Sequence, residues 1–304
     1  MTYNTQEPQS LIVFDLSVGS KIGAIDELLL NNIPDFVEKS DISRWWFNRY
    51  HQENGAVLQL FLRKDSPEFT SHEMARKLHH LDLMTLKATS RGTSDIICYA
   101  SKYLSDVYKV SEADVVVGAR LGNDKLSARV IDTHPFRHVF EEILDLLCNF
   151  CLKVISLELS GAYGLRKDAA PGLMDTLFNA LIIDEQRKEV LNSVYEEWIN
   201  YVHLSDIVRR QIEDNAKNKI LDGSLSLSNG RFSEKHKNVA IMYKNTISKI
   251  KTILSNNPEL LDEQYQLFTI QFVCESLFNS LGFQRIDLWY LCSILLKKMD
   301  QDNE

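Results

Sequence analysis

Two β-prone runs flank Asn54-Gly55 in the stretch SRWWFNRYHQENGAVLQLFLR, residues 43–63. Asn-Gly between such runs is the strongest short-range signal for a β-hairpin, because a type I′ turn needs positive φ at both central positions. The two runs are therefore expected to pair antiparallel near the N-terminus. The chain cannot be all-helical in this region.

The hairpin places an arginine, Arg49, among aromatic side chains, and the face it occupies depends on the length of the loop. If residues 54–55 are the whole loop, Arg49 faces Leu60 on an apolar face, where a guanidinium needs a carboxylate partner or a polar cavity. The side chains sharing that face are then Phe47, Leu58, Leu60 and Leu62.

A three-residue loop that begins at Glu53 reverses the faces. Trp46 and Tyr50 then join the leucines, and Arg49 lies on the other face with Phe47, Gln59 and Phe61. In both registers the arginine lies beside aromatic rings. It is either a structural arginine stacked on a ring or an arginine that binds a ligand.

The segments around the hairpin alternate in their periodicity. Residues 10–18 (SLIVFDLSV) are strand-like, residues 21–39 have helical spacing, and residues 71–84, after the hairpin, have helical spacing again. This β-α-β-β-α order is typical of an antiparallel sheet with helices packed on it.

The middle of the chain is mixed. Residues 113–121 (ADVVVGARL) and 126–132 (LSARVID) are short strand candidates, and residues 135–152 form a helix that Pro135 opens. A further strand-like run, SLELS at 156–160, precedes a glycine-containing loop.

Long apolar-periodic segments follow residue 171, and only 223–238 resembles a linker. We therefore predict an α+β fold with an antiparallel sheet and helices in the N-terminal half and a mainly helical C-terminal half. The predicted organisation is one domain, 1–304, with a peptide-binding part at 1–84, a mixed insertion at 85–170 and a helical part at 171–304.

Composition excludes several classes of function. A net charge of -8 and a pI near 5.6 disfavour binding to nucleic acid, which depends on many contacts from Lys and Arg to phosphates. The N-terminus lacks a signal-peptide pattern, and no apolar run approaches the roughly 20 residues of a membrane helix. We expect a cytoplasmic protein with no membrane partner.

No motif for a metal, cofactor or nucleotide occurs in the sequence. Cys148 and Cys151 form one CxxC, but no second pair follows at zinc-site spacing, and the five cysteines read as reduced core thiols. The sequence also lacks GxGxxG after a strand, GxxxxGK[ST] and GxSxG. We expect no metal and no organic cofactor.

Two other places carry side chains suited to chemistry. Tyr163 lies between Gly161 and Gly164, where it is either a loop tyrosine or a functional phenol. Glu275 and Asn279 lie four residues apart on one face of an apolar helical segment. A half-buried carboxylate there suits a proton donor or acceptor, but a cap or a salt bridge fits equally well.

Three stretches, in this order, resemble the thiopeptide-type bacteriocin biosynthesis family, which comprises the C-terminal elimination domain of lanthipeptide dehydratases and its free-standing relatives. The first is the aromatic strand ending in Arg-Tyr with its partner, WWFNRYHQENGAVLQLFLR. The others are GAYGLRKDAAPGLMDTLFNALIID, in place of the family's Glu-Arg-Tyr-Gly-Gly and following helix, and CESLFNSLGF, in place of its His-containing helix and Asn-Arg-Leu-Gly.

The departures from the elimination domains separate two activities within that family. Elimination domains use arginines and a histidine to expel glutamate from glutamylated Ser or Thr. Here Ala162 stands at an arginine place, Glu275 stands near the histidine place, and Gln59 and Phe61 stand where arginine is frequent. The resemblance is therefore greatest to thiopeptide pyridine synthases, which join two dehydroalanines in a formal aza-[4+2] cycloaddition.

The resemblance implies a macrocyclising pyridine synthase that acts on a leader-bearing, thiazole-rich precursor peptide. It also makes other enzymes of the pathway candidate partners. The implied catalytic residues are Arg49, Tyr50, Tyr163, Glu275 and Ser276. The implied substrate-binding residues are Trp45, Trp46, Phe47, Gln59, Phe61 and Asn279.

Two alternatives stay open. One is a lyase that eliminates glutamate in partnership with a separate glutamylating protein. The other is a non-catalytic subunit that binds the precursor peptide and presents it to other enzymes.

Overall fold

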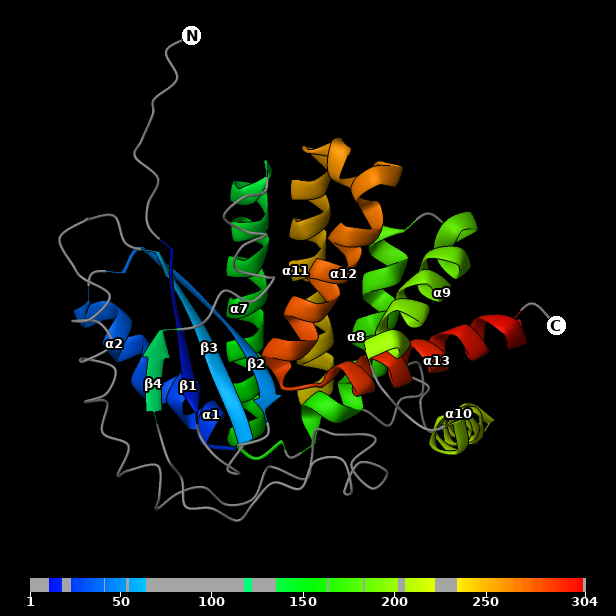
Figure 1. The fold of residues 1–304 in the computed structure, drawn as a ribbon, viewed down its shortest axis with the longest axis horizontal. Coiled ribbons are helices and arrows are strands. Elements are labelled where there is room, and N and C mark those ends of the chain that lie inside the picture. Colours follow the sequence, from blue (N-terminus) through cyan, green and yellow to red (C-terminus); the bar gives the residue numbers. More distant parts are fainter. Residues whose placement is uncertain are drawn as a thin grey trace, which may run out of the picture. The chain divides into compact units, whose positions relative to one another are not determined.

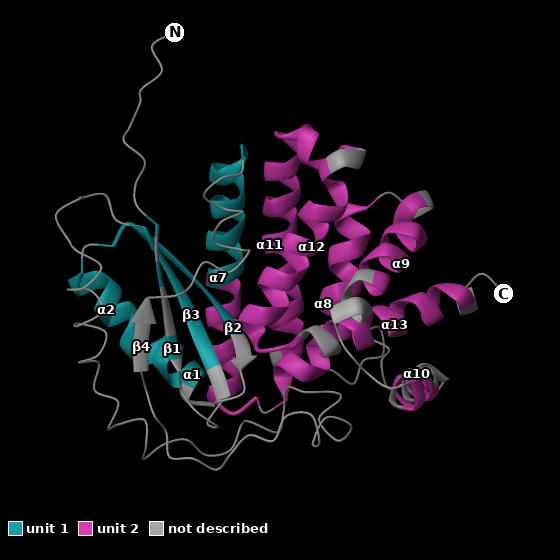
Figure 2. Cartoon of the chain, in the orientation of Figure 1, with its two compact units in different colours: residues 1–94, 110–148 teal, residues 95–109, 149–304 magenta. Residues whose placement is uncertain are grey.

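A computed structural model describes residues 11–17, 23–40, 42–52, 55–63, 118–121, 135–162, 164–182, 184–201, 206–221 and 234–302. The chain divides into two compact units, which Figure 2 colours separately. Unit 1 comprises residues 1–94 and 110–148, and unit 2 comprises residues 95–109 and 149–304. The predicted boundaries at residues 84 and 170 stay a prediction.

Unit 1 is built on a four-stranded antiparallel sheet in the order β2-β3-β1-β4 (Figure 1). The strands are β1 (Leu11–Ser17), β2 (Arg44–Gln52), β3 (Gly55–Arg63) and β4 (Gly118–Leu121). Between β1 and β2 lie α1 (Gly23–Glu27), a π-helical turn η1 (Leu28–Asn32) and α2 (Ile33–Lys39). The predicted strand at 10–18, the helical segment at 21–39 and the hairpin are confirmed.

The hairpin loop lies one residue earlier than Asn54-Gly55. Gln52 pairs with Gly55, so Arg49 pairs with Leu58. The predicted pairing of Arg49 with Leu60 is therefore wrong, although the predicted face is right, because a shift of two residues along β3 preserves the side-chain alternation. The alternative with a three-residue loop is wrong, since Phe47 pairs with Leu60 and shares its face.

Helix α7 (Arg137–Leu159) begins in unit 1 and continues into unit 2. It confirms the predicted helix after Pro135 but continues to Leu159, into SLELS at 156–160, so the strand-like interpretation of that run is wrong. Cys151, Ile155 and Glu158 are all fully buried. These positions continue a helical spacing of three to four residues, which a five-residue window does not reveal.

The described elements of unit 2 are helices, as predicted for the C-terminal half (Figure 1). Its helix α13 packs against α9 and α10, and α11 packs against α8. None of the described helices is long and apolar enough to cross a membrane. The elements are α8 (Leu165–Leu181), α9 (Asp184–Tyr201), α10 (Asp206–Leu221), α11 (Glu234–Ser255), the 3-10 turn η2 (Pro258–Leu261), α12 (Glu263–Leu281) and α13 (Arg285–Asp302).

Some predicted elements lie outside the described residues. These are the helix at 71–84, the strand at 126–132 and most of the strand at 113–121, of which Gly118–Leu121 forms β4. The predicted linker at 223–238 ends early, because α11 already begins at Glu234.

Candidate functional site

The predicted aromatic group divides between the two faces of the sheet. Trp45, Phe47 and Arg49 lie on one face, and the Trp46–Phe61 pair lies on the other. Trp46, Phe47 and Phe61 are each at most 2% exposed, and Gln59, on the face of Trp46, is also buried. Only Trp45 is partly exposed, and its ring stacks on Phe47 with centroids 6.0 Å apart.

Arg49 is buried at 3% exposure and forms an ion pair with Asp26 of α1, which is 1% exposed. The Nη1 to Oδ1 distance is 2.5 Å, and the guanidinium carbon lies 5.9 Å from the centre of the Phe47 ring. Asp26, on the helix that precedes the strand, thus supplies the carboxylate that a guanidinium on an apolar face requires. The pair joins β2 to α1. Tyr50 is described only by its backbone, which pairs with Val57 of β3.

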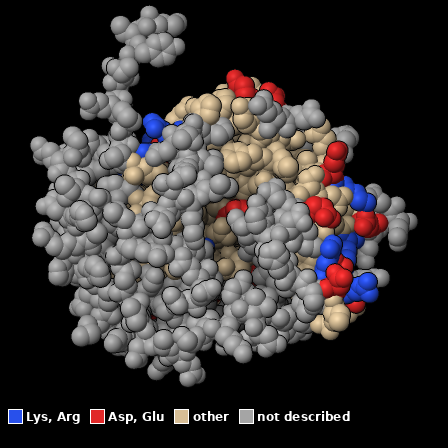
Figure 3. Space-filling view, in the orientation of Figure 1, with Lys and Arg blue, Asp and Glu red and all other residues tan. Residues whose placement is uncertain are grey.

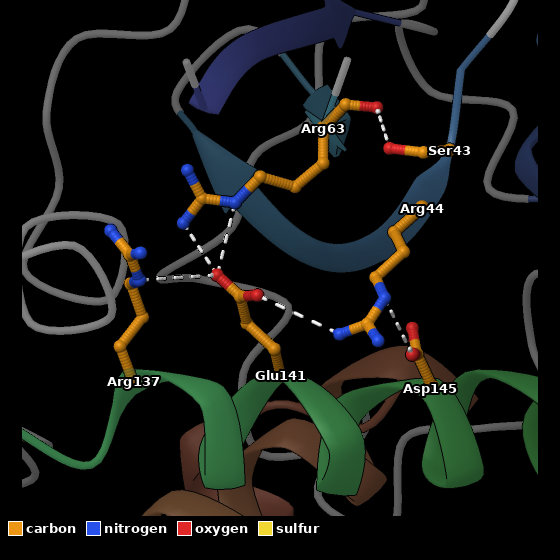
Figure 4. Close-up of polar contacts among 6 residues, drawn as sticks. All are labelled: Ser43, Arg44, Arg63, Arg137, Glu141 and Asp145. Atoms are coloured by element: carbon orange, nitrogen blue, oxygen red, sulfur yellow. Dashed lines mark hydrogen bonds and ion pairs between the residues drawn. The ribbon is translucent and has the colours of Figure 1, made fainter. Parts of the chain in front are cut away.

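A second polar cluster lies on the opposite face of the sheet, against the first half of α7 (Figure 4). Arg63 of β3 is buried and donates from Nε and Nη2 to Oε1 of Glu141 on α7. Arg44 lies 3.8 Å from Glu141 and 3.7 Å from Asp145, and Arg137 lies 3.9 Å from Glu141. Sequence analysis missed this cluster, because Arg63 and Glu141 are 78 residues apart.

The environment of Asp145 differs from that of Glu141. Burial is the largest influence on its carboxyl group and raises the pKa of Asp145; the nearby Glu141 and Glu142 act in the same direction, while the charge of Arg44 lowers it. Burial disfavours the ionised carboxylate, and among the influences on its pKa only the charge of Arg44 favours that form. Arg44 is therefore the counter-charge on which the ionised form of Asp145 depends.

In unit 2, the turn that contains Tyr163 is framed by a buried ion pair. Glu158, near the end of α7, accepts hydrogen bonds from the backbone N–H, Nε and Nη2 of Arg166 in the first turn of α8. Both side chains are fully buried. Gly161 and Gly164 adopt φ of 103° and 77°, a region that side chains rarely adopt, so the turn needs glycine there.

The same arginine connects the turn to the end of α12. Nη1 of Arg166 donates to the carbonyl oxygen of Leu281, at 3.0 Å. Glu275, Ser276 and Asn279 precede Leu281 on α12 by less than two turns; Ser276 is buried, and the other two are partly exposed. Unit 2 thus brings the ends of the predicted Tyr163 turn close to the end of the helix with the predicted acid. Tyr163 itself lies outside the described residues.

A histidine and a carboxylate also meet beside this turn. Nε2 of His236 on α11 lies 3.5 Å from Oδ2 of Asp168 on α8, whose backbone N–H donates to the carbonyl of Gly164. Within the part of the chain that the structure describes, no group of three or more His, Cys, Asp or Glu side chains is arranged to hold a metal ion.

No family model matches the sequence, and no curated protein matches it either. Solved structures do match its fold. Pyridine synthase TbtD from thiomuracin biosynthesis aligns with a TM-score of 0.53 and 14% identity, over 95% of this chain and 98% of that chain. A protein named TsrL aligns with a TM-score of 0.53 and 12% identity, over 97% of this chain and 96% of that one.

The tRNA-dependent lantibiotic dehydratase MibB from Microbispora sp. 107891 aligns with a TM-score of 0.57 and 12% identity. The match covers 100% of this chain and 29% of MibB, so the chain spans less than a third of that protein. At these identities the comparison concerns fold. The chain is structurally similar, over nearly its full length, to TbtD, to TsrL and to a part of MibB.

Proposed function

We propose that the chain is a macrocyclising pyridine synthase of thiopeptide biosynthesis. The observation that supports this most directly is the reciprocal coverage with TbtD, which includes 95% of this chain and 98% of that pyridine synthase. MibB, by contrast, is more than three times longer than the part that matches. The proposed location is the cytoplasm.

The proposed reaction joins two dehydroalanines of one peptide. One reacts as a 2-azadiene through the iminol form of its amide, and the other reacts as the alkene. Two carbon–carbon bonds form to close the ring. Loss of water and then of the leader peptide, as its carboxamide, leaves a pyridine. The reaction consumes no oxidant or reductant, so the protein needs to position the alkenes and move protons.

Positioning supplies much of the required acceleration. Effective molarities for well-oriented groups correspond to roughly 7 to 11 kcal/mol of barrier. The proposed contacts to flat thiazoles come from aromatic faces, each stack adding about 0.5 to 1.5 kcal/mol. Trp45 is the partly exposed ring among those described on β2. The proposed roles of Trp46, Phe47, Gln59 and Phe61 are to support the sheet beneath it, with Asn279 on α12 as a further substrate contact.

The proposed proton transfers keep the catalytic residues that the family resemblance implies. Arg49 or Tyr50 polarises the amide, Tyr163 donates a hydrogen bond, and Glu275 with Ser276 serves the departing groups. The ion pair of Glu158 and Arg166 supports the assignment in unit 2, because it anchors the Tyr163 turn and reaches the end of α12. The buried pair lies beside Ala162 and Gly164, the described residues on either side of Tyr163.

Mass spectrometry of the purified protein with a leader-bearing thiazole peptide that contains two dehydroalanines tests the proposal. The expected product is a macrocycle lighter by water and the leader carboxamide. Glu275→Gln and Tyr163→Phe are expected to lower the rate by about 10² or more, as for removal of a general acid or base. Glu259→Gln, an exposed change on η2, is the matched control and is expected to leave the rate unchanged.

The similarity to part of MibB keeps a glutamate-eliminating lyase as the second candidate. This reaction would remove the α-proton, form the Cα=Cβ double bond and break the bond between the β-carbon and the Ser or Thr oxygen, releasing free glutamate. A glutamylated peptide incubated with the protein would then lose glutamate. Unchanged glutamylated peptide, together with pyridine formation from the dehydroalanine peptide, would exclude the lyase and support the synthase.

A further inference from the structure

Polar contacts join four helix ends of unit 2. Glu158, near the end of α7, binds Arg166 in the first turn of α8, and Arg166 also donates to the carbonyl of Leu281, the last residue of α12. Asp168, also in the first turn of α8, lies 3.5 Å from His236, the third residue of α11. The end of α7, the starts of α8 and α11 and the end of α12 therefore lie close together.

The two charged pairs at these helix ends differ in exposure. Glu158 and Arg166 are 0% exposed, whereas 18% of the His236 side chain and 59% of the Asp168 side chain are exposed. Nε2 of His236, the nitrogen that lies 3.5 Å from Asp168, is itself buried. The exposed part of the histidine therefore belongs to its other atoms, and through them a ligand can reach the side chain.

Other ion pairs of unit 2 lie on the open surface. Over α9 and α13, acidic and basic side chains are intermixed (Figure 3), and Lys188 pairs with Asp300 there, with both side chains more than half exposed. Exposed pairs of this kind contribute little, because water screens them and both flexible side chains must be ordered. His236 differs from them, since less than a fifth of its side chain is exposed.

The position of Asp168 suits it to orient the imidazole ring. A carboxylate that faces one ring nitrogen selects the tautomer and the orientation of the ring, and the other nitrogen can then exchange protons with a ligand. The separation of 3.5 Å between Nε2 and Oδ2 is longer than a typical hydrogen bond. Catalytic contacts often have this length before a substrate binds and shorten in the complex.

The same carboxylate borders the turn that carries the predicted catalytic tyrosine. Asp168 donates its backbone N–H to the carbonyl of Gly164, at 3.0 Å. Its Oδ2 lies 3.9 Å from the position that a Cβ would take on Gly164, which directly follows Tyr163 in the sequence. Asp168 therefore contacts both a described residue of this turn and the histidine of α11.

We propose that His236 is a catalytic base of the pyridine synthesis, with Asp168 as the positioning residue that orients its ring. This inference rests on the proposed function. After ring closure, two eliminations each remove one proton from a methylene of the new ring and expel one group, first the hydroxyl and then the leader amide. A base near neutral pH is needed for both, and imidazole is the side chain best suited to that task.

The proton transfers balance in each elimination. Nδ1 of His236 takes the methylene proton, the electron pair of that C–H bond enters the double bonds of the ring, and the bond to the departing group breaks. The hydroxyl leaves as water, and the leader leaves as its carboxamide, each with a proton from the acid that the proposed function assigns to Glu275 and Ser276. The imidazolium then returns its proton to water.

Chemical rescue distinguishes a base from a structural histidine. His236→Ala is expected to lower kcat for macrocycle formation by about 10² or more, as for removal of a general base, and to change KM little. Added imidazole should restore part of the rate of this variant, in proportion to its concentration, because it can fill the space left and accept the same proton. The rate of the wild type should not respond to imidazole.

Two further variants make the test specific. His138→Ala, at an exposed histidine of α7, is the matched control and is expected to keep the wild-type rate with and without imidazole. Asp168→Asn keeps the shape of the positioning residue without its charge. It should lower kcat less than His236→Ala does, and imidazole should not restore the loss, since the histidine is still present. Thermal melts establish that each variant is folded.

The outcomes separate this role from the proposed function. A folded His236→Ala variant with the wild-type kcat, or a slow one that imidazole does not accelerate, would overturn the role of the histidine while the activity of the wild type stands. A wild-type protein that forms no macrocycle, from a substrate that TbtD converts, would overturn the proposed function and the role of His236 with it.

Discussion

Arg49 in unit 1 and Arg166 in unit 2 are both buried and both paired with a carboxylate, but the two pairs do different things. Arg49 lies in the middle of a strand and joins β2 to Asp26 of α1. Arg166 lies at the start of a helix, binds Glu158 eight residues earlier and also reaches the carbonyl of Leu281. The first pair fastens a helix to a sheet. The second pair closes a turn and connects it to a distant helix end.

The comparison shows why an unusual arginine is not automatically the functional one. Arg49 is conspicuous among aromatic residues, yet its partner already satisfies the need for a buried counter-charge. Arg166 is inconspicuous in GLRKDAAPG but is fully buried and lies three residues from Tyr163. We expect the two pairs to contribute similarly to the free energy of unfolding and to differ in their effects on catalysis.

The largest loss of stability is expected for Arg166→Met. The substitution leaves Glu158 charged and buried without its counter-charge, which costs about 3 to 5 kcal/mol of unfolding free energy. Urea denaturation measures it. The double variant Glu158→Leu with Arg166→Met removes both charges and should recover much of the loss. A single variant within about 1 kcal/mol of wild type would contradict the role of the pair.

Arg49→Met is expected to cost about 3 kcal/mol, by the same argument applied to Asp26. The double variant Asp26→Leu with Arg49→Met sharpens the comparison, because it should restore stability in denaturation experiments. Pyridine formation by this restored variant would make Arg49 a structural anchor. Restored stability with lost product would make it catalytic, as proposed.

Gly164→Ala is expected to cost about 1 to 2 kcal/mol, because φ there is 77° and an L side chain is strained in that region. Space is not the cause, since the nearest atom to an added Cβ is Oδ2 of Asp168 at 3.9 Å. Gly164→Asn, which tolerates this conformation better, should cost less by thermal denaturation. Equal costs for the two variants would show that strain is not the origin.

The smallest effect is expected at the half-exposed contact of Arg44 and Asp145. Because burial raises the pKa of Asp145, its contribution to stability is present below the unfolded pKa and is lost as pH rises through the folded value. Asp145→Asn should therefore leave stability at neutral pH unchanged or slightly higher. Unfolding free energies compared from acid to neutral pH would show it. A clear loss at neutral pH would mean that the attraction of Arg44 outweighs burial.

Local patterns predicted much of the fold. A local pattern of about 20 residues or fewer, either a turn dipeptide or an apolar period, predicts each of these elements. They are the hairpin, the strand before it and the helices of unit 2. The run SLELS was misread because its five residues alternate like a strand, whereas the buried positions of the preceding helix continue through Glu158.

The polar contacts could not be predicted in the same way. Arg63 and Glu141 are 78 residues apart, and no spacing rule connects a strand to a helix at that distance. The partner of Arg49 was anticipated as a carboxylate, but Asp26 looked like any acidic residue of an amphipathic helix. Arg166 and Glu158 lie close in sequence to the Tyr163 turn. The sequence signal for this turn was its two glycines, Gly161 and Gly164, which do not indicate an ion pair beside it.

The most direct test of the proposed reaction is the mass of the released leader. The protein is incubated with the leader-bearing, dehydroalanine-containing thiazole peptide, and the leader fragment is weighed alongside the core peptide over time. The account predicts a leader carboxamide that appears in step with an equal amount of pyridine macrocycle. An intact precursor, with a substrate that TbtD or another competent synthase converts, would contradict it.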